Sequence, residues 1–398
     1  ADRKNYFYPD LPKAYQISQF DVPICENGEV FFYVDGVKHS CRLERIHFEE
    51  DAGKLLHDEI DGTIVDFNRC GVPLIEMVTR PDLHSSAEAK EFLEMIKTTL
   101  SYLDICDCKM EEGSIRCDVN VSIRPEGSTE LGTRVEMKNI NTFSGAVRAI
   151  DYEIARQIEV VENGGEIQQE TRRWDDNKES SHAMRSKEDA QDYRYFPEPD
   201  LVPVVISDEW IERVKARQPE MRDEKLIRYQ DEFGLPKYDA EILTGDKSFA
   251  DLFEAAAAIC GKPKKVSNWI MTETIRLLKE NEMDPDQIRF SPEHLAKLVD
   301  LADAGSVTNT VAKEVFEKVF KEDIDPEAYV KEKGLLTVND EGALRETVAK
   351  VIAENPQSVE DYHNGKEKAI GFLVGQTMKA MKGKANPALV NQILKELL

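Results

Sequence analysis

Hydrophobic and polar residues alternate without interruption from Ile115 to Arg124, and this period of two predicts a half-buried β-strand. After a connection that contains proline and glycine, a second alternation follows in RVEMK. Two neighbouring strands of this kind can merge their polar faces. The merged face would carry acidic, basic and amide side chains: Asp118, Asn120, Arg134, Glu136 and Lys138. Such a face suits a metal ion or a phosphate, but antiparallel sheets often leave one face in water, so a merely solvated surface is the alternative.

A carboxylate also interrupts an apolar run. Glu76 stands inside VPLIEMV, which is hydrophobic enough to be a buried strand. Because an unpaired buried carboxylate is very costly, we expect it to meet a cation. The acidic run Glu49, Glu50, Asp51 follows another apolar stretch, where a strand is expected to end in a loop, and there it could equally be solvated. Together, Glu50, Glu76 and Asp118 offer oxygen ligands, which favour magnesium over zinc.

The pattern changes along the chain from strands with a few helices to helices almost throughout. Asp35 and Gly36 indicate a two-residue hairpin turn, and Ser85 is placed to cap a helix. A second helix is expected from about Gly145 to Glu162. We therefore predict an α+β fold with three parts: a β-rich domain over 1–218, a helical domain over 219–333 and a small helical tail over 334–398.

Composition limits the class of protein. The chain of 398 residues has a mean hydropathy of −0.50 and no run long enough to span a bilayer, which excludes a membrane protein. The first residues do not form a signal peptide, and the seven cysteines include no C-x-x-C pair, so we expect a protein of the reducing cytoplasm. Cys106 and Cys108 could hold a metal ion, but no second pair lies near them in the sequence.

Charge sets the C-terminal segment apart from the rest. The formal net charge of −25 argues against a general affinity for nucleic acid. From Tyr362 onward, however, lysines outnumber acidic residues: Lys366, Lys368, Lys379, Lys382, Lys384 and Lys395 against Glu367 and Glu396. This lysine tail is either an RNA-docking module or a solvated helix face.

The common nucleotide-binding and hydrolase motifs are absent from the sequence. It contains no P-loop, no G-x-S-x-G, no H-E-x-x-H and no G-x-G-x-x-G. Any phosphate would therefore be bound by the polar sheet face and its metal. In QETRRW, Arg172 and Arg173 could bind a phosphate bidentately.

Several long segments carry a resemblance. In order, they are RKNYFYPDLPKAYQISQFD, HFEEDAGK, DFNRCGVPLIEMV, KMEEGSIRCDVNVSIRP, EMKNIN, GGEIQQETRRW and DYRYFPEPDL, followed by NGKEKAIGFLVGQTMKAMKGKANPALVNQILKE. They resemble the B subunit of the tRNA-dependent amidotransferase (GatB), and the likeness covers essentially the whole chain. The resemblance implies a cradle domain with a curved antiparallel sheet, a helical domain and a tail that touches tRNA.

The resemblance further implies a ligase that forms a carbon–nitrogen bond with glutamine as amido donor. ATP would activate the side-chain carboxylate of mischarged Glu-tRNA(Gln), or Asp-tRNA(Asn), as an acyl phosphate, which ammonia then attacks. Ammonia would come from the amidase partner, the A subunit, with the small C subunit bound to both. No glutaminase nucleophile is visible in this sequence. The alternative is a non-catalytic tRNA-binding scaffold, which would need the lysine tail but not the acidic sheet face.

Individual residues acquire roles from the same resemblance, with ATP and Mg²⁺ as cofactors. Glu50, Glu76 and Asp118 would be magnesium ligands, directly or through water. The residues that position ATP phosphates or the activated carboxylate would be Lys4, Asn120, Glu136, Lys138 and Asn139, with Arg116 and Arg172 as further contacts. The family normally begins with a further strand that carries Glu-x-His beside the metal. This sequence starts after that strand; either the protein begins here and its metal site lacks ligands, or the sequence is a truncated one.

Overall fold

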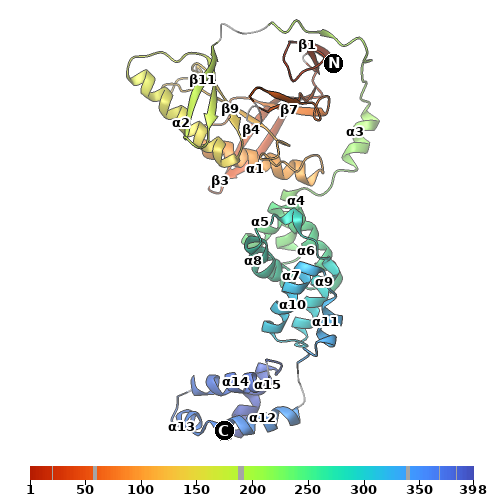
Figure 1. Ribbon diagram of the computed structural model, residues 1–398, viewed down its shortest axis with the longest axis vertical. Coiled ribbons are helices and arrows are strands. Elements are labelled where there is room, and N and C mark those ends of the chain that lie inside the picture. Colours follow the sequence, from red (N-terminus) through yellow and green to blue (C-terminus); the bar gives the residue numbers. More distant parts are fainter. Residues whose placement is uncertain (20, 57–60, 187–191, 338–340, 367, 382) are drawn as a thin grey trace. The chain divides into compact units, whose positions relative to one another are not determined.

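The computed structural model describes residues 1–19, 21–56, 61–186, 192–337, 341–366, 368–381 and 383–398. The chain divides into two compact units, Ala1–Pro219 and Glu220–Leu398. The first unit is built of sheets with a few helices, and the second of helices (Figure 1). This is the α+β class that the sequence predicts.

A six-stranded antiparallel sheet forms one part of the first unit. Its strands follow the order β12, β1, β2, β4, β3, and β7 also pairs with β4. They are β1 (Asp2–Asn5), β2 (Tyr15–Ser18), β3 (Cys25–Val34), β4 (Val37–Glu50), β7 (Pro73–Thr79) and β12 (Phe196–Pro197). The predicted hairpin is confirmed, since Asp35 and Gly36 join β3 to β4 with φ of 50° and 80°.

Helix α1 (Ser86–Tyr102) packs against this hairpin. Ser85 caps the helix as the sequence predicts, because its hydroxyl accepts a hydrogen bond from the backbone N–H of Glu88 at 3.1 Å. Phe92 of α1 meets Phe32 of β3 edge to face, and the two rings are only 7 % and 1 % exposed. This packing holds the hairpin, and with it the long strand β4.

The second sheet of the first unit has four strands, in the order β11, β10, β9, β8. They are β8 (Cys117–Val121), β9 (Val135–Ile140), β10 (Glu170–Asp175) and β11 (Ser180–Ser186). Helix α2 (Phe143–Glu162) connects β9 to β10, and these two strands run parallel, as a crossover through a helix allows. The six-stranded sheet is antiparallel, as the resemblance implies, whereas the second sheet contains one parallel pair.

One face of the second sheet packs on α2. Val135, Met137 and Trp174 of the strands meet Ala146 and Ala149 of the helix, and all five are at most 1 % exposed. Because side chains alternate along a strand, the neighbours of these residues project from the opposite face. The unit also contains a two-stranded sheet and a short helix: β5 (Lys54–Leu56), β6 (Ile64–Asp66) and α3 (Asp208–Lys215).

The second unit contains the remaining helices. They are α4 (Arg222–Asp231), α5 (Lys237–Gly245), α6 (Lys247–Cys260), α7 (Pro263–Trp269), a π-helical turn (Ile270–Thr274), α8 (Ile275–Glu280), a 3₁₀ turn (Pro285–Gln287), α9 (Pro292–Asp303), α10 (Asn309–Glu322), α11 (Pro326–Glu332), α12 (Glu341–Glu354), α13 (Pro356–His363), α14 (Lys368–Ala380) and α15 (Pro387–Leu397). Among the described residues, none of the helices is both long and apolar enough to cross a membrane.

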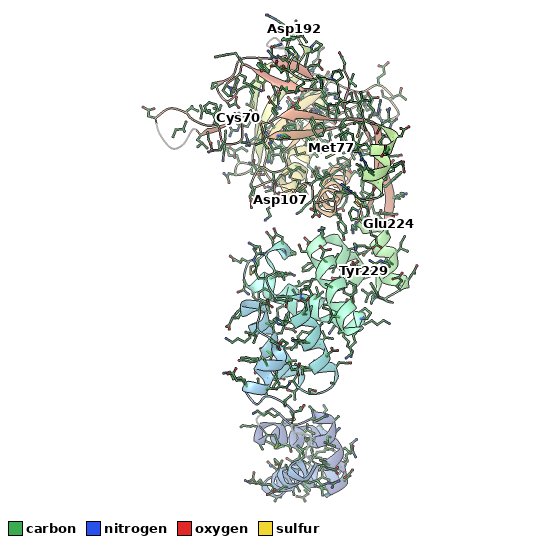
Figure 2. All side chains as sticks on the ribbon, turned by 90° about the vertical axis from the view of Figure 1, so that its right-hand side faces the viewer. Cys70, Met77, Asp107, Asp192, Glu224 and Tyr229 are labelled. Atoms are coloured by element: carbon green, nitrogen blue, oxygen red, sulfur yellow. The ribbon has the colours of Figure 1, made fainter. Side chains whose placement is uncertain are left out.

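Buried apolar side chains of the second unit form two separate clusters. One extends from Tyr229, labelled in Figure 2, to Val330, and the other from Leu344 to Leu394. Gly261 ends α6 with φ of 66°, a left-handed conformation that glycine adopts readily. The division of this unit into domains 219–333 and 334–398 stays a prediction.

Candidate functional site

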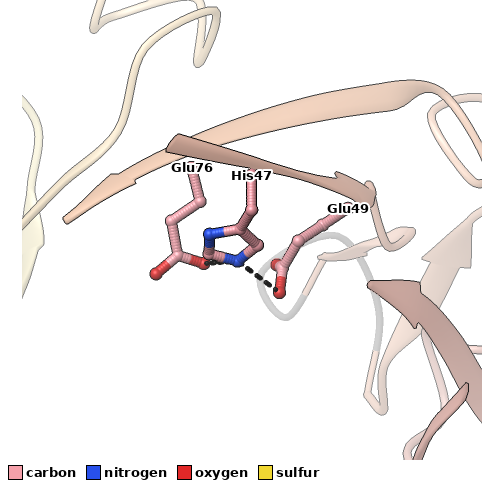
Figure 3. Close-up of side chains that lie close together, drawn as sticks. All are labelled: His47, Glu49 and Glu76. Carbon is pink, nitrogen blue, oxygen red and sulfur yellow. Dashed lines mark hydrogen bonds and ion pairs between the residues drawn. The ribbon is translucent and has the colours of Figure 1, made fainter. Parts of the chain in front are cut away.

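Three side chains that can bind a cation meet where β4 pairs with β7. His47 and Glu49 lie two residues apart on β4 and therefore project from the same face. Glu76 of β7 stands directly opposite His47 in the antiparallel register. The Nε2 atom of His47 lies 3.4 Å from Glu49 Oε1 and 3.5 Å from Glu76 Oε2 (Figure 3). One ligand atom from each residue falls within 4.8 Å of the others, a spacing that suits a metal ion.

The two carboxylates of this His47–Glu49–Glu76 cluster respond differently to their surroundings. Burial acts to raise the pKa of Glu49, but hydrogen bonds from His47 and Ser18 and the charge of Lys4 lower this pKa overall. Burial and the negative charge of Glu49 raise the pKa of Glu76. Two carboxylates this close repel each other, and a cation between them would remove the repulsion.

The donor set fits a divalent cation. Carboxylate oxygens are usual ligands of Mg²⁺, whereas imidazole nitrogen more often binds transition metals, so two carboxylates with one imidazole leave magnesium among the candidates. His47 and Glu49 are 5 % and 9 % exposed, while Glu76 is 46 % exposed. The prediction of a buried strand around Glu76 is therefore wrong, because Ile75 on the other face of β7 is itself 41 % exposed.

The predicted ligand Glu50 does not join this cluster. Alternation along β4 turns it to the opposite face, where its Oε2 atom lies 2.5 Å from Lys13 Nζ and accepts a hydrogen bond from the backbone N–H of Ile17. His47 and Glu49 are not among the metal ligands predicted from the sequence. Their signal is present in RIHFEE, where the two are spaced by two residues, but the sequence pattern predicts a loop at the acidic run, whereas β4 continues to Glu50.

Lys4, a predicted catalytic residue, lies beside the cluster. Its Nζ atom is 4.0 Å from Glu49 Oε1, and the side chain is 22 % exposed. The ammonium also lies 4.9 Å from the ring centroid of Tyr193 and 5.8 Å from that of Tyr6. Such cation–π contacts hold the ammonium in place. Burial raises the pKa of Tyr6 to about 12, so this ring stays uncharged at neutral pH.

A second group of predicted residues gathers on the face of the second sheet that points away from α2, here called the polar face. Asn120 stands opposite Glu136, and Thr171 of β10 is the next neighbour of Glu136. The Thr171 hydroxyl donates a hydrogen bond to Glu136 Oε2 at 2.8 Å. Lys138 Nζ lies 2.6 Å from Asp118 Oδ2 and 3.3 Å from Glu136 Oε1. The prediction that the two strands merge their polar faces is confirmed.

A β-bulge interrupts the pairing of β8 with β9. The register shifts by one residue, so that Lys138 and Asn139 together oppose Asp118. Asn139 accommodates the extra residue with a φ of 67°. Its Nδ2 atom donates a hydrogen bond to the backbone oxygen of Trp174 at 2.9 Å. The side chain of this predicted catalytic residue therefore holds β10 against the bulge.

The two arginines predicted to bind nucleotide are both engaged in ion pairs. Arg116 precedes β8, and its Nη2 atom lies 2.9 Å from Asp51 Oδ1. Arg172 of β10 donates hydrogen bonds to the hydroxyl and the backbone oxygen of Ser181 and pairs with Glu170 at 2.6 Å. Arg172 is 13 % exposed, and these contacts hold β10 to β11. That either arginine binds nucleotide stays a prediction.

The lysine tail lies in the second unit. Lys366 forms an ion pair with Asp361 at 2.9 Å, whereas Lys368 and Lys379 of α14 are exposed. Lys382 lies outside the described residues. The tail therefore presents lysine side chains to solvent, as both interpretations of the sequence require.

Comparisons with known proteins identify the family of this chain. Residues 1–212 match the family described as the GatB/GatE catalytic domain, and residues 251–398 match a family described as the GatB domain. Similar proteins include those of Agathobacter rectalis, 64 % identical over all of this chain and 84 % of the relative, and Lachnoclostridium phytofermentans, 59 % identical over all of this chain and 83 % of the relative. A protein of Caldicellulosiruptor bescii is 57 % identical with similar coverage. All three are named as the B subunit of an aspartyl/glutamyl-tRNA(Asn/Gln) amidotransferase. The chain therefore belongs to the GatB family of tRNA-dependent amidotransferase proteins.

Proposed function

We propose that this chain activates the side-chain carboxylate of glutamate on tRNA(Gln), or of aspartate on tRNA(Asn), and converts it to the amide. One oxygen of that carboxylate attacks the γ-phosphorus of ATP, the bond to the β-phosphate oxygen breaks, and ADP leaves. Ammonia then attacks the acyl carbon of the resulting acyl phosphate, inorganic phosphate leaves with the C–O bond electrons, and the proton that the nitrogen loses ends on this phosphate. The observation that carries the proposal is the His47–Glu49–Glu76 cluster with Lys4 beside it.

The cluster would hold the magnesium ion that phosphoryl transfer requires. When bound, a divalent cation offsets the negative charge of the phosphate oxygens. Glu49 and His47 fix its position because they are buried on the rigid strand β4, and the more exposed Glu76 closes the site from β7. The roles of Glu50 and Asp118 as further ligands stay predictions.

Other residues of this chain would position the anionic groups. Lys4 carries its ammonium 4.0 Å from the cluster and can neutralise a phosphate or the activated carboxylate. On the polar face, Lys138 and Asn120 offer N–H donors, while Asp118 and Glu136 hold the Lys138 ammonium in place. Phosphoryl transfer relies on such positioned charges and on little covalent chemistry by the protein.

Partners follow from the family. The relatives are named as B subunits, so they work in an assembly of several different chains. We propose that an amidase partner, the A subunit, supplies ammonia from glutamine, that a small C subunit joins the assembly, and that the lysine tail contacts the tRNA. We also propose that the complex acts in the cytoplasm.

The test compares three glutamates in the assembled complex. We expect Glu49→Gln and Glu76→Gln to lower tRNA-stimulated, magnesium-dependent ATP hydrolysis at least about a hundredfold, which corresponds to roughly 2.7 kcal/mol of transition-state stabilisation. Glu44→Gln is the matched control: it removes the same charge from the same strand β4, at a side chain that is 48 % exposed and outside the cluster, and should keep most of the activity. ATP hydrolysis and amide formation, both with mischarged tRNA, are the measurements.

The same experiment separates catalysis from a scaffold role. A non-catalytic tRNA-binding scaffold does not use the cluster, so Glu49→Gln and Glu76→Gln would leave amide formation unchanged. In that case the proposed activation chemistry would have to be abandoned for this chain. Removal of divalent cations by a chelator, followed by addition of Mg²⁺, should abolish and restore hydrolysis in the wild-type complex and in the control variant.

A further inference from the structure

Two adjacent arginines of β10 have opposite surroundings. Arg172 is 13 % exposed and uses its guanidinium N–H groups on Ser181 and Glu170. Arg173 lies in register with Lys138 of β9 and with His182 of β11, and its side chain is exposed. Within the part of the chain that the structure describes, Arg173 takes part in no ion pair or side-chain hydrogen bond. No polar contact within the described residues therefore accounts for an arginine at this position of the polar face.

Arg173 is an available cation on the polar face. Lys138 is already paired with Asp118 at 2.6 Å and with Glu136 at 3.3 Å, so its charge is balanced within the sheet. Residues in register on neighbouring strands lie about 4.8 Å apart and point to the same side. The row Lys138, Arg173, His182 thus sets three nitrogen-bearing side chains side by side across three strands.

We propose that Arg173 binds a phosphate group on the polar face. A guanidinium presents a planar fork of N–H donors that matches two phosphate oxygens. The phosphate belongs either to a nucleoside triphosphate or to an RNA backbone. The inference rests on the proposed function, because ATP and tRNA are the phosphate-bearing substrates of that reaction.

Equilibrium binding to the assembled complex tests the inference without depending on turnover. The probes are MgATP and uncharged tRNA, the latter at several salt concentrations. We compare Arg173→Gln and Arg173→Lys with Arg213→Gln, which removes the same charge from an exposed arginine of α3. Because Arg173 is exposed, its variants should unfold in urea at the wild-type midpoint.

We expect Arg173→Gln to weaken binding of one probe by about tenfold, as loss of a charge-assisted hydrogen bond does, and Arg173→Lys to recover part of it. Weaker MgATP binding assigns the phosphate to the nucleotide. Weaker tRNA binding, with a dependence of log affinity on log salt that is flatter by roughly 0.7 to 0.9, assigns it to the RNA. If both affinities stay within about twofold of Arg213→Gln, the inference is overturned.

Failure of the proposed function would look different. If Glu49→Gln keeps full ATP hydrolysis while Arg173→Gln loses phosphate binding, the metal cluster is not the catalytic centre, yet Arg173 remains a phosphate contact. If Glu49→Gln is inactive while Arg173→Gln binds both probes as Arg213→Gln does, the catalytic role of the cluster is supported and phosphate binding by Arg173 is excluded.

Discussion

Asn139 has a backbone conformation that few side chains tolerate. Its φ of 67° is accessible to asparagine and glycine, but it strains a β-branched residue. We expect Asn139→Val to lower the free energy of unfolding by about 1–3 kcal/mol from backbone strain, in addition to the lost hydrogen bond. Asn139→Gly keeps the backbone and loses only the bond to the Trp174 oxygen, which costs about 1 kcal/mol. Urea denaturation of the two variants measures the difference.

The glycine variant also tests the catalytic role that the resemblance implies for Asn139. If its side chain positions a reacting group, Asn139→Gly should fold but lose amide formation in the complex. Wild-type amide formation in a folded Asn139→Gly protein would show that the side chain serves the bulge alone.

Single residues show how far the site can be predicted from sequence. Alternation is local, so the residues of β8 and β9 that share a face follow directly from their spacing. The choice between Glu49 and Glu50 requires the end of β4, which is set by pairing with β7, a segment distant in the sequence. Shifting the pairing of β4 with β7 by one residue exchanges the two faces. Arg172 and Arg173 likewise point to opposite faces of the sheet, and the register of β10 with β9 decides which of them lies on the polar face.

At the scale of elements, the strand predicted from Ile115 to Arg124 is shorter in the structure and ends at Val121. Beyond this point the backbone hydrogen bonds are made to the side-chain amide of Gln157 on α2. Its Nε2 donates to the Val121 oxygen and its Oε1 accepts from the Ile123 N–H, each at 3.1 Å. A side chain from another element thus replaces a strand neighbour. Neither this contact nor the parallel pairing of β9 with β10 leaves a periodic signal in the sequence.

Strands β1 and β12 are joined by an ion pair that predicts a pH dependence. Arg3 donates hydrogen bonds to both carboxylate oxygens of Glu198, at 2.6 and 2.9 Å, and Glu198 is 1 % exposed. These hydrogen bonds lower the pKa of Glu198 to about 2, from an ordinary value of 4.5. Because the folded protein has the lower pKa, the stabilisation is complete above about pH 4.5 and is lost as the pH falls toward 2.

We therefore expect Glu198→Gln to be less stable than the wild type at neutral pH, with a difference that shrinks as the pH falls from about 4.5 toward 2. Urea midpoints of both proteins over this range measure the difference. The pKa of Asp82 is likewise lowered to about 2 by Arg42, but this pair is the same in both proteins and cancels. A stability difference that does not change with pH would contradict the assigned ion pair.

For the whole molecule, the lysine tail contrasts with a net charge of −25. Lys368 and Lys379 lie about three turns apart on α14 and share a face of that helix. If they contact tRNA phosphates, replacing both with glutamine should weaken tRNA binding. The dependence of log affinity on log salt should flatten by roughly 0.7 to 0.9 for each contact.

The turnover number for amide formation with saturating tRNA should stay unchanged in this double variant, because the candidate metal site lies in the other unit. Lys279→Gln, an exposed lysine of α8, is the control. An unchanged salt dependence would mean that the tail lysines are a solvated helix face.

The exposure of the polar side chains in the first unit affects how many ATP molecules the reaction consumes for each amide formed. Glu76, Asp118 and Lys138 are 46 %, 49 % and 40 % exposed, so bulk water reaches the place where the proposed acyl phosphate would form. Water at its full concentration then competes with ammonia for the same carbon. We expect the number of ATP molecules consumed per amide to exceed one when ammonium is supplied to the chain without its partners. The stoichiometry should approach one only where another surface covers these strands, so the yield of the reaction would be set by assembly as much as by chemistry.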